Sequence, residues 1–272
     1  MDRRSLAREL SAIEDGTAVH EVGEGLVLAI TGPPGVGKSC LVDSILHRIV
    51  PQNKVAVLAV DPTSPVSGGA LLGDRIRMSV LDDDSKTDSI YVRSVATRSS
   101  SGSLPGVIEG LSSHLLSKDF DLVIIETVGA GQSEMRCAAV ADRIIVVEGP
   151  ARGDGIQAEK AGLLELADLI VVNKCDLDGA DKVVNDLTVS LTLSQNAPAI
   201  EKVSALTGEG MDNLASILMN IPARANQRAK NRQRLLMAHE HKLTSNPNFE
   251  TVLDRMSEEG LSLERALREL DD

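Results

Sequence analysis

The sequence predicts an α/β protein built on a doubly wound, mainly parallel β-sheet with helical extensions at both ends. Short apolar runs of strand length recur between residues 25 and 203, and most are separated by amphipathic stretches of helical length. Neighbouring parallel strands need a crossover of about ten or more residues, usually a helix, so this alternation predicts a parallel sheet. The first apolar run also opens directly into a glycine-rich turn and a helix.

The elements of the first half follow from their hydrophobic periods. Residues 3–14 place three apolar side chains on one helical face, and residues 25–31 (GLVLAIT) read as a buried strand. A helix over 38–50 stops at Pro51. The remaining predictions here are strands at 54–61, 90–95 and 121–126, a helix at 106–116, and, after Pro62, a long Gly/Ser/Pro-rich loop that turns helical around Leu71.

The second half continues the alternation and then changes character. Strands are predicted at 143–147, 169–172 and 200–203, with helices ending at 167 and spanning 181–193 and 211–220. From Pro222 onward only helices are predicted, at 223–242, 249–256 and 263–270. We therefore expect a helical N-terminal extension (1–24), a nucleotide-binding domain (25–221) and a helical C-terminal extension (222–272) for dimerisation or partner contact.

Residues 32–39 (GPPGVGKS) match the phosphate-binding pattern G-x-x-x-x-G-K-[ST] at every fixed position. Glycines let backbone N–H groups close around a phosphate, and the following helix adds the partial positive charge of its N-terminus. Lys38 can reach the β and γ phosphates, and Ser39 can offer its hydroxyl to Mg²⁺. The predicted nucleotide contacts are Gly32, Pro33, Gly35, Val36, Gly37, Lys38, Ser39 and Cys40.

A second motif predicts that the base is guanine. Asn173-Lys174-Cys175-Asp176 ends an apolar strand and fits the guanine-reading pattern N-K-x-D. Its aspartate accepts from the ring N–H and the exocyclic amine, a pair of donors that adenine does not present, and such paired polar contacts discriminate strongly. Ser204, Ala205 and Leu206 follow the last predicted strand and fit a loop that backs the base with main-chain N–H groups. Together these segments favour GTP over ATP.

Acidic residues at the ends of predicted strands are candidate Mg²⁺ ligands. Glu126-Thr127-Val128-Gly129 has the acid-x-x-Gly form in which the acid holds Mg²⁺ and the Gly129 N–H touches the γ-phosphate. Asp61 ends the neighbouring strand, and Asp74 lies in the following loop. The predicted metal ligands are Ser39, Asp61, Asp74 and Glu126, and Lys38, Glu126 and Asp61 are the predicted catalytic residues. Gln132 is a candidate by location for positioning the attacking water.

Composition limits the other classes of function. The net charge of −12 argues against broad contact with nucleic acid or anionic membrane, although a local positive pocket can still hold phosphate. Aromatic residues make up only 1% of the chain, so the core has to be aliphatic. The three cysteines lack metal-ligand spacing and are expected to be core thiols in a reducing compartment. With no run of membrane-spanning length, the protein is expected to be cytoplasmic.

Taken together, the motifs resemble the MeaB/ArgK family of GTPases, which chaperone adenosylcobalamin-dependent acyl-CoA mutases including methylmalonyl-CoA mutase. The resemblance spans about residues 3–221 and rests on GPPGVGKS, VDPTSPVSGGALLGDRIRM, ETVGAGQSE, the segment from Gly153 to Leu177 and SALTGEG. It implies a P-loop fold of the SIMIBI type, GTP and GDP as substrate and product, Mg²⁺, and a homodimer. It also implies a segment that couples nucleotide state to the mutase at Asp154, Gln157 and Lys160.

The sequence differs from the family pattern in its shorter N-terminal and C-terminal extensions and in Pro105-Gly106, where the family has two glycines. Other classes therefore stay open at this point: a nickel-insertion GTPase, a kinase, or a nucleotide-dependent binding module. The basic residues Arg224, Arg228, Lys230, Arg232 and Arg234 also allow two interpretations. They form either a partner surface or, as we favour, the solvated face of a helix packed on its own domain.

Overall fold

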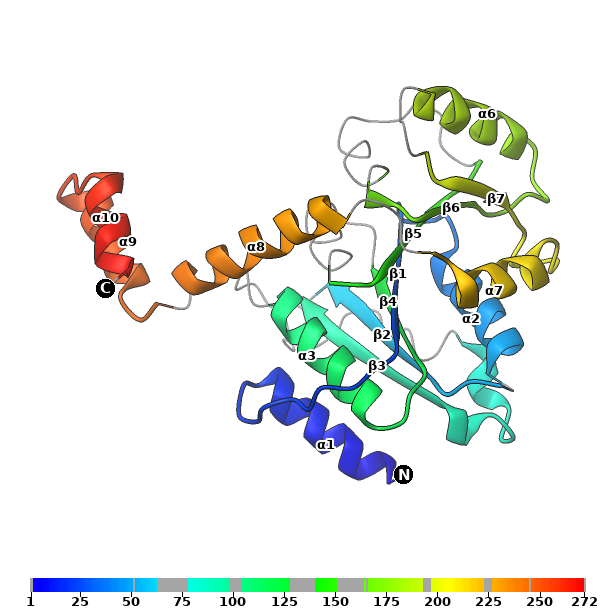
Figure 1. Ribbon diagram of the computed structural model, residues 1–272, viewed down its shortest axis with the longest axis horizontal. Helices are drawn as coiled ribbons and strands as arrows, with labels where there is room; N and C mark the ends of the chain where they lie inside the picture. Colours follow the sequence, from blue (N-terminus) through cyan, green and yellow to red (C-terminus); the bar gives the residue numbers. More distant parts are fainter. Residues whose placement is uncertain are drawn as a thin grey trace.

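The computed structural model describes residues 2–50, 52–62, 78–97, 104–127, 140–150, 164, 166–192, 197–222, 227–244 and 246–271. Its centre is a seven-stranded, all-parallel sheet (Figure 1). The strands are β1 (Leu26–Thr31), β2 (Val55–Pro62), β3 (Ile90–Thr97), β4 (Leu122–Thr127), β5 (Arg143–Glu148), β6 (Leu169–Val172) and β7 (Ala199–Lys202). Their spatial order is β3-β2-β4-β1-β5-β6-β7. The predicted fold class is confirmed.

The order of the strands reverses direction between β1 and β5. The chain leaves β1 toward β2 on one side of the sheet, whereas it leaves β5 toward β6 on the other. Such a switch point opens a crevice outside the carboxyl ends of the strands, where open parallel sheets bind their ligands. The segment that follows β1 lies at this position and is the predicted phosphate loop.

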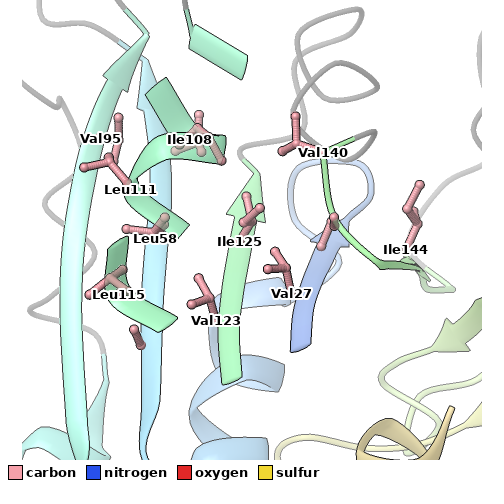
Figure 2. Packing of buried hydrophobic residues seen from close by; sticks show 14 of the residues in the cluster. Val27, Leu58, Val95, Ile108, Leu111, Leu115, Val123, Ile125, Val140 and Ile144 are labelled. Atoms are coloured by element: carbon pink, nitrogen blue, oxygen red, sulfur yellow. The ribbon is translucent and has the colours of Figure 1, made fainter. Parts of the chain in front are cut away.

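Helices cover both faces of the sheet. One face packs against α1 (Arg3–Glu14), α3 (Leu104–Ser117) and α6 (Ala180–Leu191), and the other against α2 (Lys38–Ile49) and α7 (Met211–Asn220). Figure 2 shows Ile108, Leu111 and Leu115 of α3 lying over Leu58, Val95 and Ile125 of the sheet. The core is aliphatic, as the composition predicts, with Tyr91 and Phe120 in one edge-on contact at 6.3 Å between ring centroids.

The N-terminal helix is held by polar contacts as well as by its apolar face. Leu6, Leu10 and Ile13 are buried, as their spacing predicts. Arg93 of β3 donates to Glu14 Oε2 at 2.6 Å, and Glu9 Oε2 lies 3.0 Å from His114 Nε2 and 3.3 Å from Lys118 Nζ of the α3 region. Helix α1 is therefore joined to the edge strand β3 and to α3.

The C-terminal helices extend away from the sheet. Helix α8 (Gln227–Thr244) runs outward in Figure 1, and α9 (Phe249–Glu258) and α10 (Leu263–Asp271) lie at its far end. The α9–α10 pair has its own small core of Val252, Ala266 and Leu270. Of the basic cluster, Arg234 donates to the Val140 carbonyl at 2.7 Å, and Arg228 and Arg232 are exposed. The exposed arginines agree with the favoured interpretation of a solvated helix face, and the Arg234 contact agrees with packing on the same domain, whereas Arg224 and the side chain of Lys230 lie outside the described part of the structure.

Two further expectations concern thiols and the membrane. Cys40 is exposed, so the prediction of a core thiol is wrong there: it lies on the outward side of the first turn of α2, whereas the apolar face of that helix is turned to the sheet. Cys137 lies outside the described residues. Within the described part of the chain, no helix combines the length and hydropathy that crossing a bilayer requires.

Candidate functional site

The phosphate loop requires glycine where it passes the neighbouring strand. Gly32 follows β1 with φ at +146°, and a Cβ atom there would lie 2.1 Å from the Val147 carbonyl oxygen of β5. Real side chains do not tolerate that approach, so the loop can cross the end of β5 only with glycine at this position. Gly37 precedes the first residue of α2 with φ at +89°, in the left-handed region that also favours glycine.

Lys38 brings a positive charge into this loop. The residue is 7% exposed, and its Nζ donates to the carbonyl oxygens of Gly32 at 2.6 Å and Pro33 at 3.1 Å. The ammonium group therefore lies beside the N-terminus of α2, whose unsatisfied N–H groups carry a partial positive charge. Two positive electrostatic contributions converge on the space that the loop encloses, which suits an anionic phosphate.

Ser39 and Glu126 come together from different elements. The Ser39 hydroxyl, in the first turn of α2, donates to Glu126 Oε1 at 2.7 Å, and Glu126 is 4% exposed near the end of β4. A hydroxyl and a carboxylate are the hard oxygen donors that Mg²⁺ takes, and Mg²⁺ uses few protein ligands when it is bound to phosphates. In the described residues no three His, Cys, Asp or Glu side chains form a cage for a metal ion. The donor pair therefore fits Mg²⁺ held jointly with a nucleotide.

The other predicted ligands are only partly placed. The backbone of Asp61 lies in the penultimate position of β2, opposite Ala96 of β3, and the side chain of Asp61 is outside the described part of the structure. Asp74, Gly129, Gln132, Asp154, Gln157 and Lys160 also lie outside the described residues. The predictions for these seven positions stay predictions.

Asn173 joins three loops at the carboxyl edge of the sheet. It is 2% exposed, its Nδ2 donates to the Val36 carbonyl at 2.9 Å, and its Oδ1 accepts from the Ala205 N–H at 3.0 Å. A Cβ atom at Gly37 would lie 2.8 Å from that same Nδ2, a second reason for glycine there. Asn173 therefore fixes the distance between the phosphate loop and the loop after β7.

Lys174 also joins the loop after β6 to the phosphate loop, and its backbone is strained. Its φ is +63°, a left-handed conformation that non-glycine residues seldom adopt, and its Nζ donates to the Gly35 carbonyl at 2.6 Å. Backbone outliers of this kind persist where the surrounding structure holds them and cluster at functional sites. The strained residue at the end of β6 therefore points to a built binding site.

Asp176 is oriented by the loop that follows β7. Its Oδ1 accepts from the Ser204 hydroxyl at 2.5 Å, and the Ser204 oxygen itself accepts from the Thr207 N–H at 3.1 Å. Ser204 is fully buried, whereas the neighbouring Leu206 side chain is 87% exposed. Burial, together with the nearby Glu209 carboxylate, raises the pKa of the Cys175 thiol. The hydrogen bond from Ser204 thus fixes the Asp176 carboxylate as an acceptor in the loop predicted to read the base.

Sequence reasoning missed several contacts that hold these loops. Gly149 follows β5, and a Cβ atom there would lie 3.3 Å from the Asn173 carbonyl oxygen. Thr31 and Thr127 are buried and joined by a hydroxyl–hydroxyl bond of 2.9 Å between the ends of β1 and β4. Their only signal in the sequence is that each ends an apolar strand.

The chain is similar to known proteins over most of its length. Residues 5–260 match the family described as methylmalonyl-CoA mutase-associated GTPase MeaB. The chain is 39% identical over 231 residues to a putative GTPase of Pyrococcus horikoshii, covering 78% of this chain and 72% of that one. It is 37% identical over 199 residues to the GTPase ArgK of Escherichia coli, covering 67% and 58%.

A further relative is named as a fused mutase. The fused isobutyryl-CoA mutase of Cupriavidus metallidurans is 36% identical over 200 residues, which cover 68% of this chain and 18% of that much longer one. Among solved structures, a LAO/AO transport system kinase aligns with a TM-score of 0.61 at 22% identity, covering 100% of this chain and 98% of that one. HypB, a hydrogenase maturation factor of Archaeoglobus fulgidus, aligns with a TM-score of 0.54 at 22% identity, covering 80% and 97%.

The two structural likenesses show that this chain shares its overall fold with those proteins. The family is shown by the match over nearly the whole length and by the sequence relatives. This chain belongs to the MeaB family of methylmalonyl-CoA mutase-associated GTPases.

Proposed function

We propose that this protein is a Mg²⁺-dependent GTPase that chaperones an adenosylcobalamin-dependent acyl-CoA mutase, gating cofactor loading or protecting the mutase. The observation that carries the proposal is the direct contact between the phosphate loop and the N-K-x-D loop within a chain of the MeaB family. Asn173 donates to the Val36 carbonyl and Lys174 to the Gly35 carbonyl. The segments proposed to contact the phosphates and the base therefore form one connected site in a chain of this family.

Hydrolysis in such a site depends on position and charge. Lys38 and the N-terminus of α2 neutralise the phosphates, and the main-chain N–H groups of the loop stabilise charge that develops on the transferred group. Ser39 and Glu126, with Asp61 and Asp74, are the proposed Mg²⁺ ligands. The ion, when bound, would act as a Lewis acid that offsets the negative charge of the phosphates. We propose a slow reaction for the protein alone that its partner accelerates.

Base selection depends on Asp176, which Ser204 orients. A carboxylate offers two acceptor oxygens to the two adjacent donors of guanine, and adenine cannot match this pair. The Ala205 N–H is already engaged by Asn173 and the Ser204 N–H by the Glu209 carbonyl, so of the three proposed residues the main-chain contact to the base falls to Leu206. GTP and GDP are therefore the proposed substrate and product.

The mutase partner is supported by the fused relative. A segment similar to this chain makes up 18% of a protein named fused isobutyryl-CoA mutase, so a domain of this type occurs on one chain with a mutase. Two proteins that act together are often fused, because the tether raises the effective concentration of one at the other. We propose the same pairing between separate chains here, in the cytoplasm.

We also propose a homodimer formed through the C-terminal helices. Five leucines are exposed there, at fractions from 38% to 72%: Leu235, Leu236, Leu253, Leu263 and Leu267. Large exposed apolar side chains concentrated on one extension are typical of an interface. The predicted division of the chain into domains at residues 24 and 221 also stays a prediction.

The test of the function is GTP hydrolysis by the purified protein, alone and with a candidate adenosylcobalamin-dependent acyl-CoA mutase from the same organism. We expect hydrolysis that requires Mg²⁺, prefers GTP over ATP and rises when the mutase is added. Tight GTP binding without stimulation would instead favour a binding module, nickel binding would favour a nickel-insertion GTPase, and a phosphorylated product made from ATP would favour a kinase.

Replacing Lys38 by alanine should abolish nucleotide binding or turnover, because it removes the buried cation beside the phosphates. The measurement is binding of a fluorescent GTP analogue together with phosphate release. Lys182→Ala, which removes an exposed lysine of α6, is the matched control and should leave both unchanged. Full GTPase activity in Lys38→Ala would overturn the proposed function.

A further inference from the structure

Two buried hydroxyl groups meet where strands β1 and β4 end. Thr31 is fully buried and Thr127 is 2% exposed, and Thr127 Oγ1 donates to Thr31 Oγ1 at 2.9 Å. Residues 26–30 of β1 and 122–125 of β4 are all apolar. In such surroundings a hydroxyl needs a hydrogen-bond partner, because burying it without one destabilises the fold. The pair is therefore a specific contact between the two strands.

This contact lies directly beyond the backbone pairing of the two strands. The parallel register of β1 and β4 ends with Ile30 opposite Glu126. Each strand keeps its pairing on the other side for one more residue, β1 with β5 at Thr31 and β4 with β2 at Thr127. The hydroxyl–hydroxyl bond therefore joins β1 to β4 one residue past their last backbone pair.

The residues next to the two threonines belong to the candidate site. The residue after the first threonine is Gly32, whose carbonyl oxygen accepts from Lys38 Nζ at 2.6 Å. The residue before the second is Glu126, whose Oε1 accepts from the Ser39 hydroxyl at 2.7 Å. The bond between the threonines thus lies one residue from the phosphate loop and one residue from the candidate Mg²⁺ ligand.

The threonine side chains lie on the opposite face of the sheet from α2. Ile30, which pairs with Glu126, packs in the core that contains α2. Successive side chains of a strand point to opposite faces, so the next residue on each strand points to the face that α3 covers. The two hydroxyls are therefore placed to act through Gly32 and Glu126 and not by touching the nucleotide.

The hydrogen bond holds the strand ends closer than an apolar contact would. The two oxygens are 2.9 Å apart, whereas carbon atoms in contact stay about 3.5–4.0 Å apart. Replacing both hydroxyls by methyl groups should therefore separate the strand ends by roughly 1 Å. A displacement of about 1 Å in a positioned site can lower a reaction rate by about a hundredfold.

We propose that Thr31 and Thr127 are positioning residues for the candidate Mg²⁺ and phosphate site. Their hydrogen bond holds Glu126 at a fixed distance from the phosphate loop, so that Glu126 and Ser39 can bind one ion together. The inference rests on the proposed GTPase function and adds to it. It gives a role to two hydroxyls that have no predicted contact with nucleotide or metal.

The test compares the double variant Thr31→Val/Thr127→Val with Thr31→Ser/Thr127→Ser. Valine keeps the shape of threonine without the hydroxyl, and serine keeps the hydroxyl. Replacing both partners of a hydrogen bond by apolar groups of the same shape is close to neutral for stability, so the double valine variant should unfold in urea almost as wild type does. Each single valine variant leaves one buried hydroxyl without its partner and should be less stable than the double one.

The first readout is binding of a fluorescent GTP analogue in EDTA and over a series of Mg²⁺ concentrations. The double valine variant should need roughly fivefold more Mg²⁺ for half-maximal effect, the loss expected when one hydrogen bond no longer holds a ligand in place. Its GTP hydrolysis with saturating GTP and Mg²⁺ should fall by about tenfold or more. Its affinity in EDTA should match wild type, and the double serine variant should behave as wild type throughout.

A second readout needs neither nucleotide nor ion. Amide hydrogen exchange over residues 30–39 of the nucleotide-free protein should speed up in the double valine variant and not in the double serine variant. Ser112→Ala is the matched control, because Ser112 of α3 is also buried (3% exposed) and its hydroxyl makes no hydrogen bond within the described residues. It should leave the exchange, the Mg²⁺ requirement and the hydrolysis rate unchanged.

Each outcome decides a separate question. An unchanged Mg²⁺ requirement and rate in a folded double valine variant overturn the inference and leave the GTPase proposal intact. Equal loss of nucleotide affinity in EDTA and in Mg²⁺ also overturns it, because that loss shows a general structural role. If the double valine variant does not fold, Thr127→Val takes its place, with the same two results against the inference. A wild-type protein that binds no GTP would overturn the proposed function first.

Discussion

At the scale of single residues, the site is determined by side chains that connect loops. Asn173 and Lys174 reach from β6 to the phosphate loop, and Ser204 reaches from the loop after β7 to Asp176. The first two contacts join a segment proposed to read the base to the phosphate loop, and the third joins the two segments proposed to contact the base. A substitution at one of these residues should therefore change binding more than its own contact with the ligand suggests.

Asp176→Asn should lower GTP affinity by on the order of a hundredfold, because the amide places a donor where guanine also has donors. The same variant should gain affinity for XTP, whose base carries a carbonyl oxygen in place of the exocyclic amine. Competition between the two nucleotides for a fluorescent analogue measures both effects. Asp178→Asn, at an exposed position two residues on, is the control. Unchanged preference for GTP in Asp176→Asn would contradict the assignment of this carboxylate.

At the scale of elements, the attachment of α1 depends on pH. The hydrogen bond from His114, with smaller contributions from Ser5 and Lys118, holds the pKa of Glu9 below its ordinary value of 4.5. A carboxyl group whose pKa is lowered by folding stabilises the folded state above its unfolded pKa. That stabilisation is lost as the pH falls through the folded pKa.

Glu9→Gln should therefore reduce the free energy of unfolding at pH 7, and the difference from wild type should shrink as the pH falls through the lowered pKa of Glu9. Urea unfolding at a series of pH values measures this change. The Glu9 side chain is 39% exposed, so the effect should be small and should weaken with salt. Glu109→Gln, at an exposed position on α3, serves as the control. A difference that stays constant down to pH 3 would show that the ion pair is not its cause.

At the scale of the whole molecule, the sheet order brings distant segments to one edge. β1 lies between β4 and β5, which places the phosphate loop beside Glu126 on one side and Val147 on the other. The C-terminal helices project from this body and carry the exposed leucines (Figure 1). Nucleotide chemistry and proposed self-association are thus assigned to separate parts of the molecule.

Replacing both Leu235 and Leu263 by glutamate should convert the proposed dimer to a monomer, because charges would enter an apolar interface. Sedimentation velocity measures the mass, and GTP hydrolysis by the variant alone should stay near the wild-type rate. Val189→Glu is the matched control, since Val189 on α6 is also exposed (69%) but lies outside the C-terminal helices. A wild-type protein that sediments as a monomer would contradict the dimer outright.

The sequence by itself determined the type and order of the elements. Local periodicity reflects one face of one helix or strand, so all seven strands were predicted, with boundaries within a residue or two of those observed. The phosphate and N-K-x-D loops were found because their chemistry requires particular residues at fixed spacing along the chain. The family followed from the same motifs and is confirmed by the match over residues 5–260.

Tertiary structure decided which strands are neighbours and which loops touch. No local pattern encodes that β4 lies between β1 and β2, or that Ser79 meets Asp43 across 36 positions of sequence. The exposure of Cys40 was missed for the same reason, because burial depends on the partner that a helix face meets. Contacts between distant residues depend on packing of the whole chain, and sequence periodicity reports only on each element's own faces.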